Sequence, residues 1–333
     1  MNYSHVFMND ALIPTTTTPQ IETGFLNPTG VSCYLNAAFQ SLFSSLWFSE
    51  ALSHISSISP NIDNFSQRFP LLSSILDLYS TVVLTDHSFP SLGTSQSPVS
   101  CLSNFADVLR NKVQDISRQQ DCHEFLTSLF EYLHEETKCL FTSDAFTSTE
   151  GRKSKRDLTM SKSVSSVIFS GTLESRTIKS KKIVSKRIEP FFSLSLEVEN
   201  FDNILDSLID FQRPKMIEDS RQYLQHSFGS VPKCLIVHLK KFKFIKSTNS
   251  LQKIDKFVRF PRILSISDVK YELMSLLCHV GQSLSSGHWF CYRKNKKTAT
   301  WQCANDDVIK RVEEREVLSS RSAVLLFYDQ IFS

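Results

Sequence analysis

Cys33 is the residue of this chain best placed to act as a nucleophile. Ser32 before it is a suitable N-cap, which puts Cys33 in the first turn of a helix. Unpaired N–H groups and the positive end of the helix dipole favour an anion there, so the thiol should lose its proton readily and attack as the thiolate. The alternative is an inert cysteine buried at the start of a helix, because free cysteine is among the most buried residue types.

A cysteine nucleophile needs a base, and the base needs a third group to hold its ring. His288 directly follows a glycine at the start of an apparent strand, where a rigid element can aim its side chain. Downstream, Asn305 or Asp306 in the segment WQCANDD could accept a hydrogen bond from the imidazole and fix its tautomer. His238 lies in the apolar run LIVHLKKF, which favours a structural role.

The elements that must position these residues predict an α+β fold. Apolar residues between Gly24 and Leu140 recur at helical spacing, as at Leu71, Ile75 and Leu78. Leu35, Phe39, Leu42 and Leu46 predict one helical stripe behind Cys33. The second half of the chain carries short runs of branched and aromatic residues, which predict strands at Val167–Phe169, Phe191–Val198, Cys234–Leu239, Phe257–Phe260, Trp289–Tyr292 and Val324–Tyr328.

Composition narrows the class of protein. The 333 residues are 41% hydrophobic and 21% charged, the balance of a globular protein with a sizeable core, and a net charge of +3 is too small to argue for nucleic acid. No segment has the ~18 apolar residues that span a bilayer, and the N-terminal stretch lacks the pattern of a signal peptide. The eight cysteines are scattered and include no C-x-x-C pair. We therefore expect no membrane association and a reducing compartment, the cytoplasm and/or the nucleus.

Four sequence blocks together resemble the ubiquitin-specific protease family. The first is GFLNPTGVSCYLNAAFQSL at residues 24–42, similar to the family's cysteine box, and the second is QQDCHEF at residues 119–125. The third is LKKF at residues 239–242, and the fourth joins GHW at residues 287–289 to WQCANDD at residues 301–307. The blocks occur in the family's order and cover nearly the whole chain.

This resemblance implies a papain-like cysteine protease fold with a helical thumb and a β-rich palm and fingers. The implied catalytic domain is residues 23–331, after a disordered lead-in of residues 1–22. Its expected parts are the thumb at about 24–145, a basic linker at about 150–163, the fingers at about 164–232 and the palm at about 233–331.

The resemblance also implies roles for individual residues. Cys33 matches the nucleophile, His288 the general base, Asn305 the residue that orients the base, and Asp306 the neighbouring acid. The expected substrate-binding residues are Asp121, Gln120 and Trp289. The implied activity is thiol-dependent hydrolysis of the bond after ubiquitin's C-terminal glycine, with ubiquitin and ubiquitinated proteins as partners. The alternatives are a weak or inactive ubiquitin-binding scaffold and a protease for a ubiquitin-like modifier.

Two departures from the family pattern bear on these expectations. Pro28 occupies the position where the family has an oxyanion-stabilising asparagine, and it cannot donate a hydrogen bond. Either the loop bulges and returns Asn27 to the site, or backbone N–H groups serve instead. In the fingers, Lys179 and Lys182 stand where many members have zinc-binding cysteines, and an ammonium cannot replace a thiolate. We therefore expect no zinc and no cofactor.

Two basic segments remain. Residues 151–162 carry five basic residues and one acidic residue, and we interpret them as an exposed linker that does not bind nucleic acid. Residues 176–187 of the fingers carry six basic residues and no acidic one. This second segment is a candidate contact surface for an acidic partner, with a merely solvated face as the alternative.

Overall fold

The described part of the chain covers most of the expected domain. The computed structural model describes residues 20–21, 23–28, 30–84, 105–109, 118–141, 161–218, 220–247, 249–283, 286–295 and 298–331. The predicted lead-in lies outside the described residues except for Gln20–Ile21, which form a short strand. The predicted basic linker lies outside them except for residues 161–163. Within the described part, no helix is long and apolar enough to cross a membrane.

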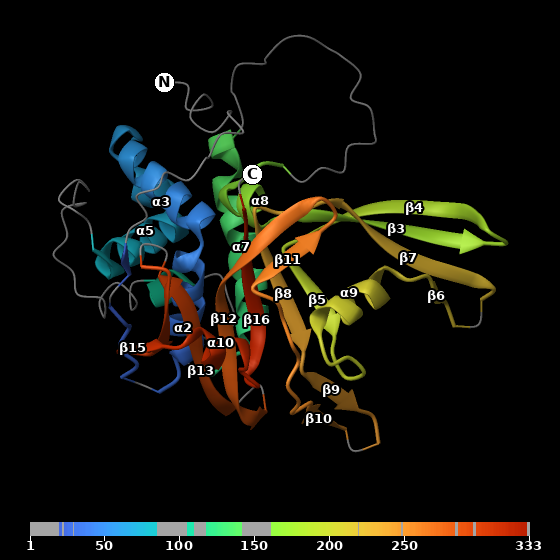
Figure 1. The fold of residues 1–333 in the computed structure, drawn as a ribbon. Helices are drawn as coiled ribbons and strands as arrows, with labels where there is room; N and C mark the ends of the chain where they lie inside the picture. The colour runs from blue at the N-terminus through green and yellow to red at the C-terminus, as the bar shows by residue number, and fades with distance from the viewer. Residues whose placement is uncertain are drawn as a thin grey trace, which may run out of the picture.

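Helices build the first half of the molecule (Figure 1). They are α2 (Cys33–Ser44), α3 (Leu46–Ile58), α4 (Phe65–Arg68), α5 (Pro70–Val82), α7 (Cys122–Thr137) and α8 (Val164–Phe169), with 3₁₀ turns at Ser59–Asn61 and Lys138–Phe141. Residues 105–109 are also helical. The short strands β1 (Gln20–Ile21) and β2 (Val83–Leu84) pair antiparallel beside these helices. The helical half confirms the first part of the α+β prediction.

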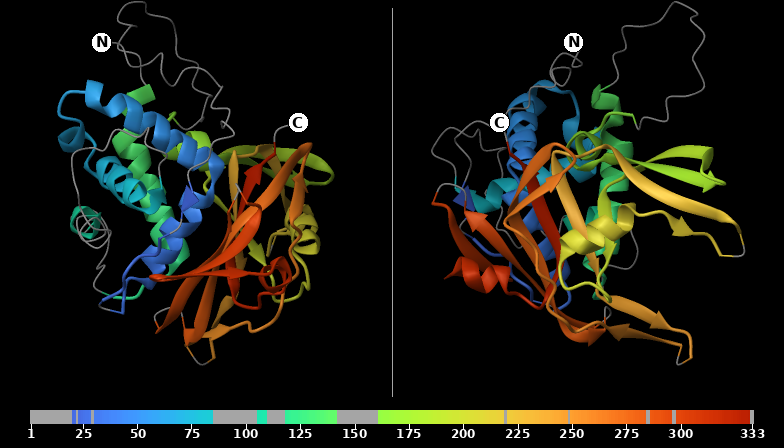
Figure 2. Two further views of the ribbon diagram at one scale, coloured as in Figure 1. Left: turned by 60° about the vertical axis from the view of Figure 1, so that its left-hand side comes forward. Right: turned by 45° about the vertical axis from the view of Figure 1, so that its right-hand side comes forward.

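An eight-stranded sheet forms the palm, in the order β15-β14-β13-β12-β16-β8-β5 with β11 added on β12. Its strands are β5 (Ser193–Glu197), β8 (Cys234–Lys240), β11 (Ile263–Ile266), β12 (Val269–Ser283), β13 (Ser286–Asn295), β14 (Thr300–Asn305), β15 (Val308–Val312) and β16 (Ala323–Gln330). Only the β5–β8 pair in this sheet is parallel. The helices lie against one side of the palm in both views of Figure 2.

A second sheet projects away from the palm as the fingers (Figure 1). Its strands run in the order β4-β3-β7-β6, with β3 (Gly171–Lys179), β4 (Lys182–Phe191), β6 (Lys215–Met216) and β7 (Gln222–Ser230). The hairpin β9 (Phe242–Ile245) and β10 (Ser250–Lys253) is a separate two-stranded sheet that contacts β12 through Lys253. Helices α9 (Ile204–Gln212) and α10 (Glu314–Leu318) complete the fold. The range expected for the fingers, about 164–232, therefore also contains elements of other parts of the fold. Strand β5 belongs to the palm sheet, and helix α8 packs on the thumb helix α7.

Two of the predicted strands are wrong. Val167–Phe169 belongs to helix α8, because the Ser163 side chain accepts the N–H of Ser166 and the Ser166 side chain accepts the N–H of Ser163, a capping box. Phe257–Phe260 contains only an isolated bridge from Arg259 to Asn203. Short apolar runs do not distinguish strands from buried helical turns or packed loops, so both errors arise from local pattern alone.

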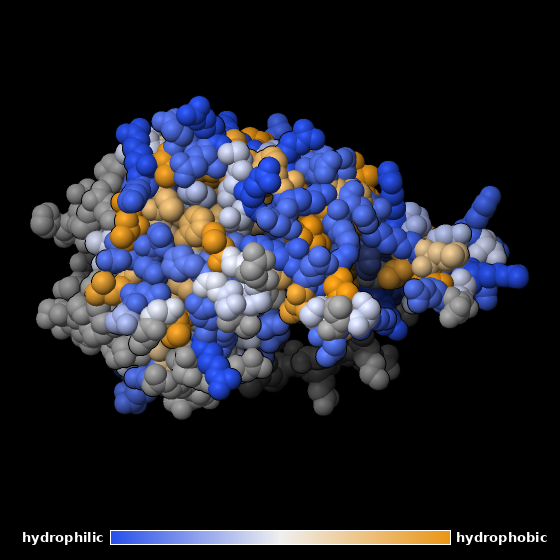
Figure 3. All heavy atoms as spheres, turned by 90° about the horizontal axis from the view of Figure 1, so that it is seen from below, coloured by the Kyte–Doolittle hydropathy of each residue, from blue (hydrophilic) through white to orange (hydrophobic). Residues whose placement is uncertain are grey.

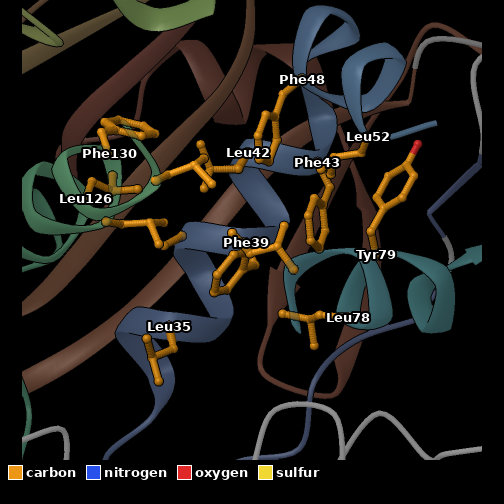
Figure 4. Packing of buried hydrophobic residues seen from close by; sticks show 14 of the residues in the cluster. Leu35, Phe39, Leu42, Phe43, Phe48, Leu52, Leu78, Tyr79, Leu126 and Phe130 are labelled. Atoms are coloured by element: carbon orange, nitrogen blue, oxygen red, sulfur yellow. The ribbon is translucent and has the colours of Figure 1, made fainter. Parts of the chain in front are cut away.

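Helix α2 lies at the centre of the core, with all twelve of its residues buried. Phe39 packs edge-on against Phe105, with ring centroids 4.7 Å apart. The predicted stripe ends at Leu42, because the extended backbone of Ser45 breaks the helix and Ser45 caps α3, where Leu46 belongs. Figure 4 shows how side chains of α2, α3, α5 and α7 interdigitate around Phe39. A helix enclosed in this way presents its N-terminal residue in a fixed place.

Candidate active site

Cys33 is the first residue of α2, as predicted, and its side chain is fully buried. Ser32 stands at the N-cap, but its side chain makes no capping bond. Instead the Ser32 Oγ donates to the Asn27 Oδ1 at 2.9 Å. The prediction that Ser32 is the N-cap and that Cys33 lies in the first turn is confirmed, although the Ser32 side chain makes no capping bond. The Cys33 residue still lies at the N-terminus of α2, where unpaired N–H groups would stabilise a thiolate.

His288, on β13, is brought to Cys33 from the other end of the chain. Its Nε2 lies 2.5 Å from the Oδ1 of Asn305 at the end of β14, and the Cys33 side chain is near enough to act on the pKa of its ring. The interaction with Cys33 is the main cause that raises the pKa of His288 to about 9, against the opposing effect of burial, and the Asn305 bond adds to it. The imidazolium therefore persists at neutral pH, as the partner of a thiolate nucleophile requires.

Asp306 ties the cysteine loop to the histidine strands. Its carboxylate accepts the Asn36 Nδ2 at 2.7 Å and the Asn27 Nδ2 at 3.1 Å. Its backbone carbonyl accepts the Phe25 N–H at 2.9 Å. Asp306 has a positive φ of 52°, so the chain turns sharply directly after Asn305. A side chain at Gly24 would place its Cβ 2.3 Å from the Asp306 carbonyl oxygen, so only glycine fits there.

The Asn27 side chain is held between Ser32 and Asp306. Its Oδ1 accepts both the N–H and the hydroxyl of Ser32, at 3.1 and 2.9 Å. One Nδ2 proton is used by Asp306, and the amide carries two. The loop therefore places a side-chain amide beside the residue that precedes the nucleophile.

Asp121 is the N-cap of α7, and its carboxylate accepts the His123 N–H at 2.6 Å. Burial is the main cause that raises the pKa of the Asp121 carboxyl. Gln120, the residue before it, is half-buried. Trp289 is not brought to the site: its ring is 1% exposed and packs on His279 with centroids 4.7 Å apart. Adjacent strand residues face opposite sides, so the strand that aims His288 at Cys33 turns Trp289 into the core.

Sequence reasoning missed two residues of the site. Asn36 is the buried partner of Asp306, and the signal was available, since Asn36 follows Cys33 by three residues and shares its helix face. Gln119 contacts the residue before the general base, with its Nε2 donating to the Gly287 carbonyl at 2.7 Å. In the described residues, no group of three or more His, Cys, Asp or Glu side chains could hold a metal ion.

Comparisons with known proteins agree with this geometry. The family model described as ubiquitin carboxyl-terminal hydrolase matches residues 23–328. The chain is 32% identical over 255 residues to ubiquitin hydrolase B of Dictyostelium discoideum, covering 64% of this chain and 56% of that protein. It is 28% identical over 311 residues to ubiquitin carboxyl-terminal hydrolase 13 of Saccharomyces cerevisiae, covering 82% and 40%. The chain thus spans about half the length of these relatives or less.

Among solved structures, the fold is similar to a chain of the SAGA Ubp8/Sgf11/Sus1/Sgf73 DUB module bound to ubiquitin aldehyde. The TM-score is 0.78 at 19% identity, over 97% of this chain and 72% of that chain. A second structure of the module matches with a TM-score of 0.75 at 22% identity, over 96% and 70%. These matches confirm the predicted fold of thumb, palm and fingers.

The raised pKa of His288 yields a direct test by NMR titration of the histidine rings. We expect His288 to lose its proton near pH 9 in the wild-type protein. In Cys33→Ala the main cause of the shift is gone, so the midpoint should fall towards the ordinary value of about 6.5. His238, whose pKa burial lowers to about 3, is the internal control and should stay neutral in both proteins. An unchanged midpoint near pH 9 in Cys33→Ala would contradict the assigned Cys33–His288 interaction.

Proposed function

Because the chain belongs to the ubiquitin carboxyl-terminal hydrolase family, we propose that it is a cysteine-type deubiquitinase. Its substrates are ubiquitin conjugates, in which it hydrolyses the peptide or isopeptide bond after ubiquitin's C-terminal glycine. The single observation that carries this proposal is the Cys33–His288–Asn305 constellation, in which Asn305 hydrogen-bonds the base and Cys33 is the main cause of the raised pKa of His288. We also propose the cytoplasm and/or the nucleus as its location, in keeping with the free thiols of the described cysteines.

The reaction follows from the positions of these groups. The Cys33 thiolate attacks the carbonyl carbon of the last glycine, and the His288 imidazolium gives its proton to the leaving amine. The products of this step are the free amine and a thioester between Cys33 and ubiquitin. A water molecule then gives one proton to His288 and attacks the thioester. This step releases ubiquitin's carboxylate, restores the Cys33 thiolate and His288 imidazolium, and leaves the second proton of the water to the released amine. Asn305 holds the imidazole ring through both steps.

The oxyanion formed in each step needs donors. The backbone N–H of Cys33 is one, at the free N-terminus of α2. We propose the second Nδ2 proton of Asn27 as the other, because bonds to Asp306 and to Ser32, the residue before the nucleophile, hold that amide in place. This arrangement replaces the donor that Pro28 cannot supply.

The nucleophile is tested by replacing it. Cys33→Ala should abolish release of a fluorophore from a ubiquitin C-terminal conjugate, because no other group can form the thioester. Cys139→Ala, at an exposed cysteine far from the site in the sequence, is the matched control and should retain full activity. Wild-type turnover by Cys33→Ala would refute the mechanism. Tight ubiquitin binding without turnover by the wild type would favour a ubiquitin-binding scaffold. Turnover of a conjugate of another modifier would favour a protease for a ubiquitin-like modifier.

The oxyanion assignment is tested at Asn27. Asn27→Ala should lower kcat roughly 100-fold, the usual cost of one lost oxyanion donor. Ser32→Ala removes one of the two side-chain bonds that orient Asn27 and leaves the donor in place, so its effect should be far smaller. An Asn27→Ala enzyme with the kcat of the wild type would show that the backbone alone stabilises the oxyanion.

We also propose that the basic segment 176–187 of the fingers contacts an acidic partner. Its β3–β4 turn has positive φ at Ser180 and Lys181, a two-residue hairpin turn that projects the neighbouring lysines. Lys186 pairs with Glu174 at 2.6 Å. Lys179 and Lys182 are exposed and have no ion-pair partner among the described residues. The arm at the right of Figure 3 carries hydrophilic residues at its tip and along its edge, interspersed with hydrophobic ones.

A glutamate-rich peptide is a suitable probe of this surface. We expect the double variant Lys179→Glu, Lys182→Glu to weaken its binding at least about fivefold at low ionic strength, with the difference disappearing near 1 M salt, where screening is nearly complete. The palm variant Lys270→Glu, Lys310→Glu makes the same change of charge and should not weaken binding selectively. Equal losses in both variants would indicate a nonspecific effect of net charge.

A further inference from the structure

The Gln119 side chain crosses from the start of the thumb helix α7 to the palm, next to the nucleophile. Its Nε2 donates to the Gly287 carbonyl at 2.7 Å, and its Oε1 accepts the Gly287 N–H at 3.0 Å. The same Nε2 lies 4.0 Å from the Cys33 sulfur and 3.5 Å from the Gly30 carbonyl. The carboxamide therefore fills the space between the nucleophile and the residue that precedes the general base.

The two bonds to Gly287 have the pattern of a peptide ladder. One residue gives its N–H and its C=O to a single partner, as in a hydrogen-bonded pair of antiparallel strands. A primary amide offers the same donor and acceptor as an extended peptide backbone. The Gln119 side chain thus takes the bonds that an extended chain would make if it ran past Cys33 beside Gly287.

Gly287 presents a bare backbone because a side chain cannot be accommodated there. A Cβ on Gly287 would lie 2.4 Å from the His279 Nε2 and 2.6 Å from the Val280 carbonyl oxygen, and its φ is +155°. His279 behind it is fully buried, so the glycine rests on a packed support. A backbone held in this way is suited to pair with another backbone of the least bulk, such as a chain that ends in two glycines.

We propose that Gln119 is a gate: in the free protein its carboxamide occupies the place of the substrate's last peptide group, and the diglycine tail binds by displacing it. The inference rests on the proposed function. The gate opens by rotation of one half-buried side chain, because Asp121 anchors the backbone two residues further on by capping α7. Gly287 then exchanges both of its bonds from Gln119 to the tail.

The gate makes a kinetic prediction opposite to that for an ordinary binding residue. A closed gate lowers apparent affinity by the fraction of molecules that are open. Gln119→Ala should therefore lower the KM for a ubiquitin C-terminal fluorophore conjugate roughly 5- to 50-fold, the range expected for two hydrogen bonds that need not be broken, with kcat little changed. Association of fluorescent ubiquitin with Cys33→Ala should speed up by a similar factor when Gln119→Ala is added.

Two further variants complete the experiment. Gln67→Ala makes the same chemical change at an exposed position of α4 and should leave both constants unchanged. Gln119→Asn is one methylene too short to bridge to Gly287, so it should also lower KM, and it serves if Gln119→Ala does not fold.

Other outcomes overturn the proposal in distinguishable ways. A raised KM would make Gln119 a wall of the tail site, and a kcat lowered at constant KM would make it an oxyanion donor. An unchanged KM would show that the two Gln119–Gly287 hydrogen bonds do not oppose substrate binding. If the wild type releases no fluorophore, the proposed function fails, while the association rates of the two Cys33→Ala proteins still decide whether Gln119 is a gate.

Discussion

The site depends on the half-buried carboxylate of Asp306 more than on any other interaction. It accepts the side-chain amides of Asn27 and Asn36, while its carbonyl accepts the N–H of Phe25. These three partners lie in the segment around the nucleophile, and Asp306 directly follows the residue that orients the base. Charge-assisted hydrogen bonds are shorter and stronger than hydrogen bonds between neutral groups. One side chain therefore holds the two ends of the chain in register.

The rest of the architecture keeps that connection rigid. Helix α2 is buried on all sides, and it packs against β13, which carries His288. At the junction of α2 and α3, the Asp329 carboxylate of β16 accepts the Ser45 hydroxyl and the Leu46 N–H, both at 2.7 Å. The nucleophile and base thus belong to elements that cannot shift independently. The enclosed setting also lets the interaction with Cys33 outweigh the burial that would otherwise lower the pKa of His288.

By contrast, the proposed gate beside Gly287 is the side chain of one residue, Gln119, which can rotate. The amide of Gln119 pairs with both the N–H and the carbonyl of Gly287, so this peptide unit has hydrogen-bond partners in the free state. A rigid catalytic centre behind a side chain that rotates can keep its geometry while the tail enters. The rigid elements α2 and β13 hold the catalytic residues in place, and the Gln119 side chain controls access to them.

The sequence alone determined the chemistry and the class of fold. Helical spacing placed Leu71, Ile75 and Leu78 correctly on one buried helix, and the blocks around Cys33, His288 and Asn305 identified the residues that meet, because these patterns are local. Tertiary structure decided what local pattern cannot express: that Val167–Phe169 is helical, that Trp289 faces inward, that Ser32 gives its hydroxyl to Asn27, and that Gln119 reaches Gly287. Each of these depends on a partner distant in sequence or on which face of a strand is buried, and a hydrogen bond across 168 residues leaves no periodic trace in the chain.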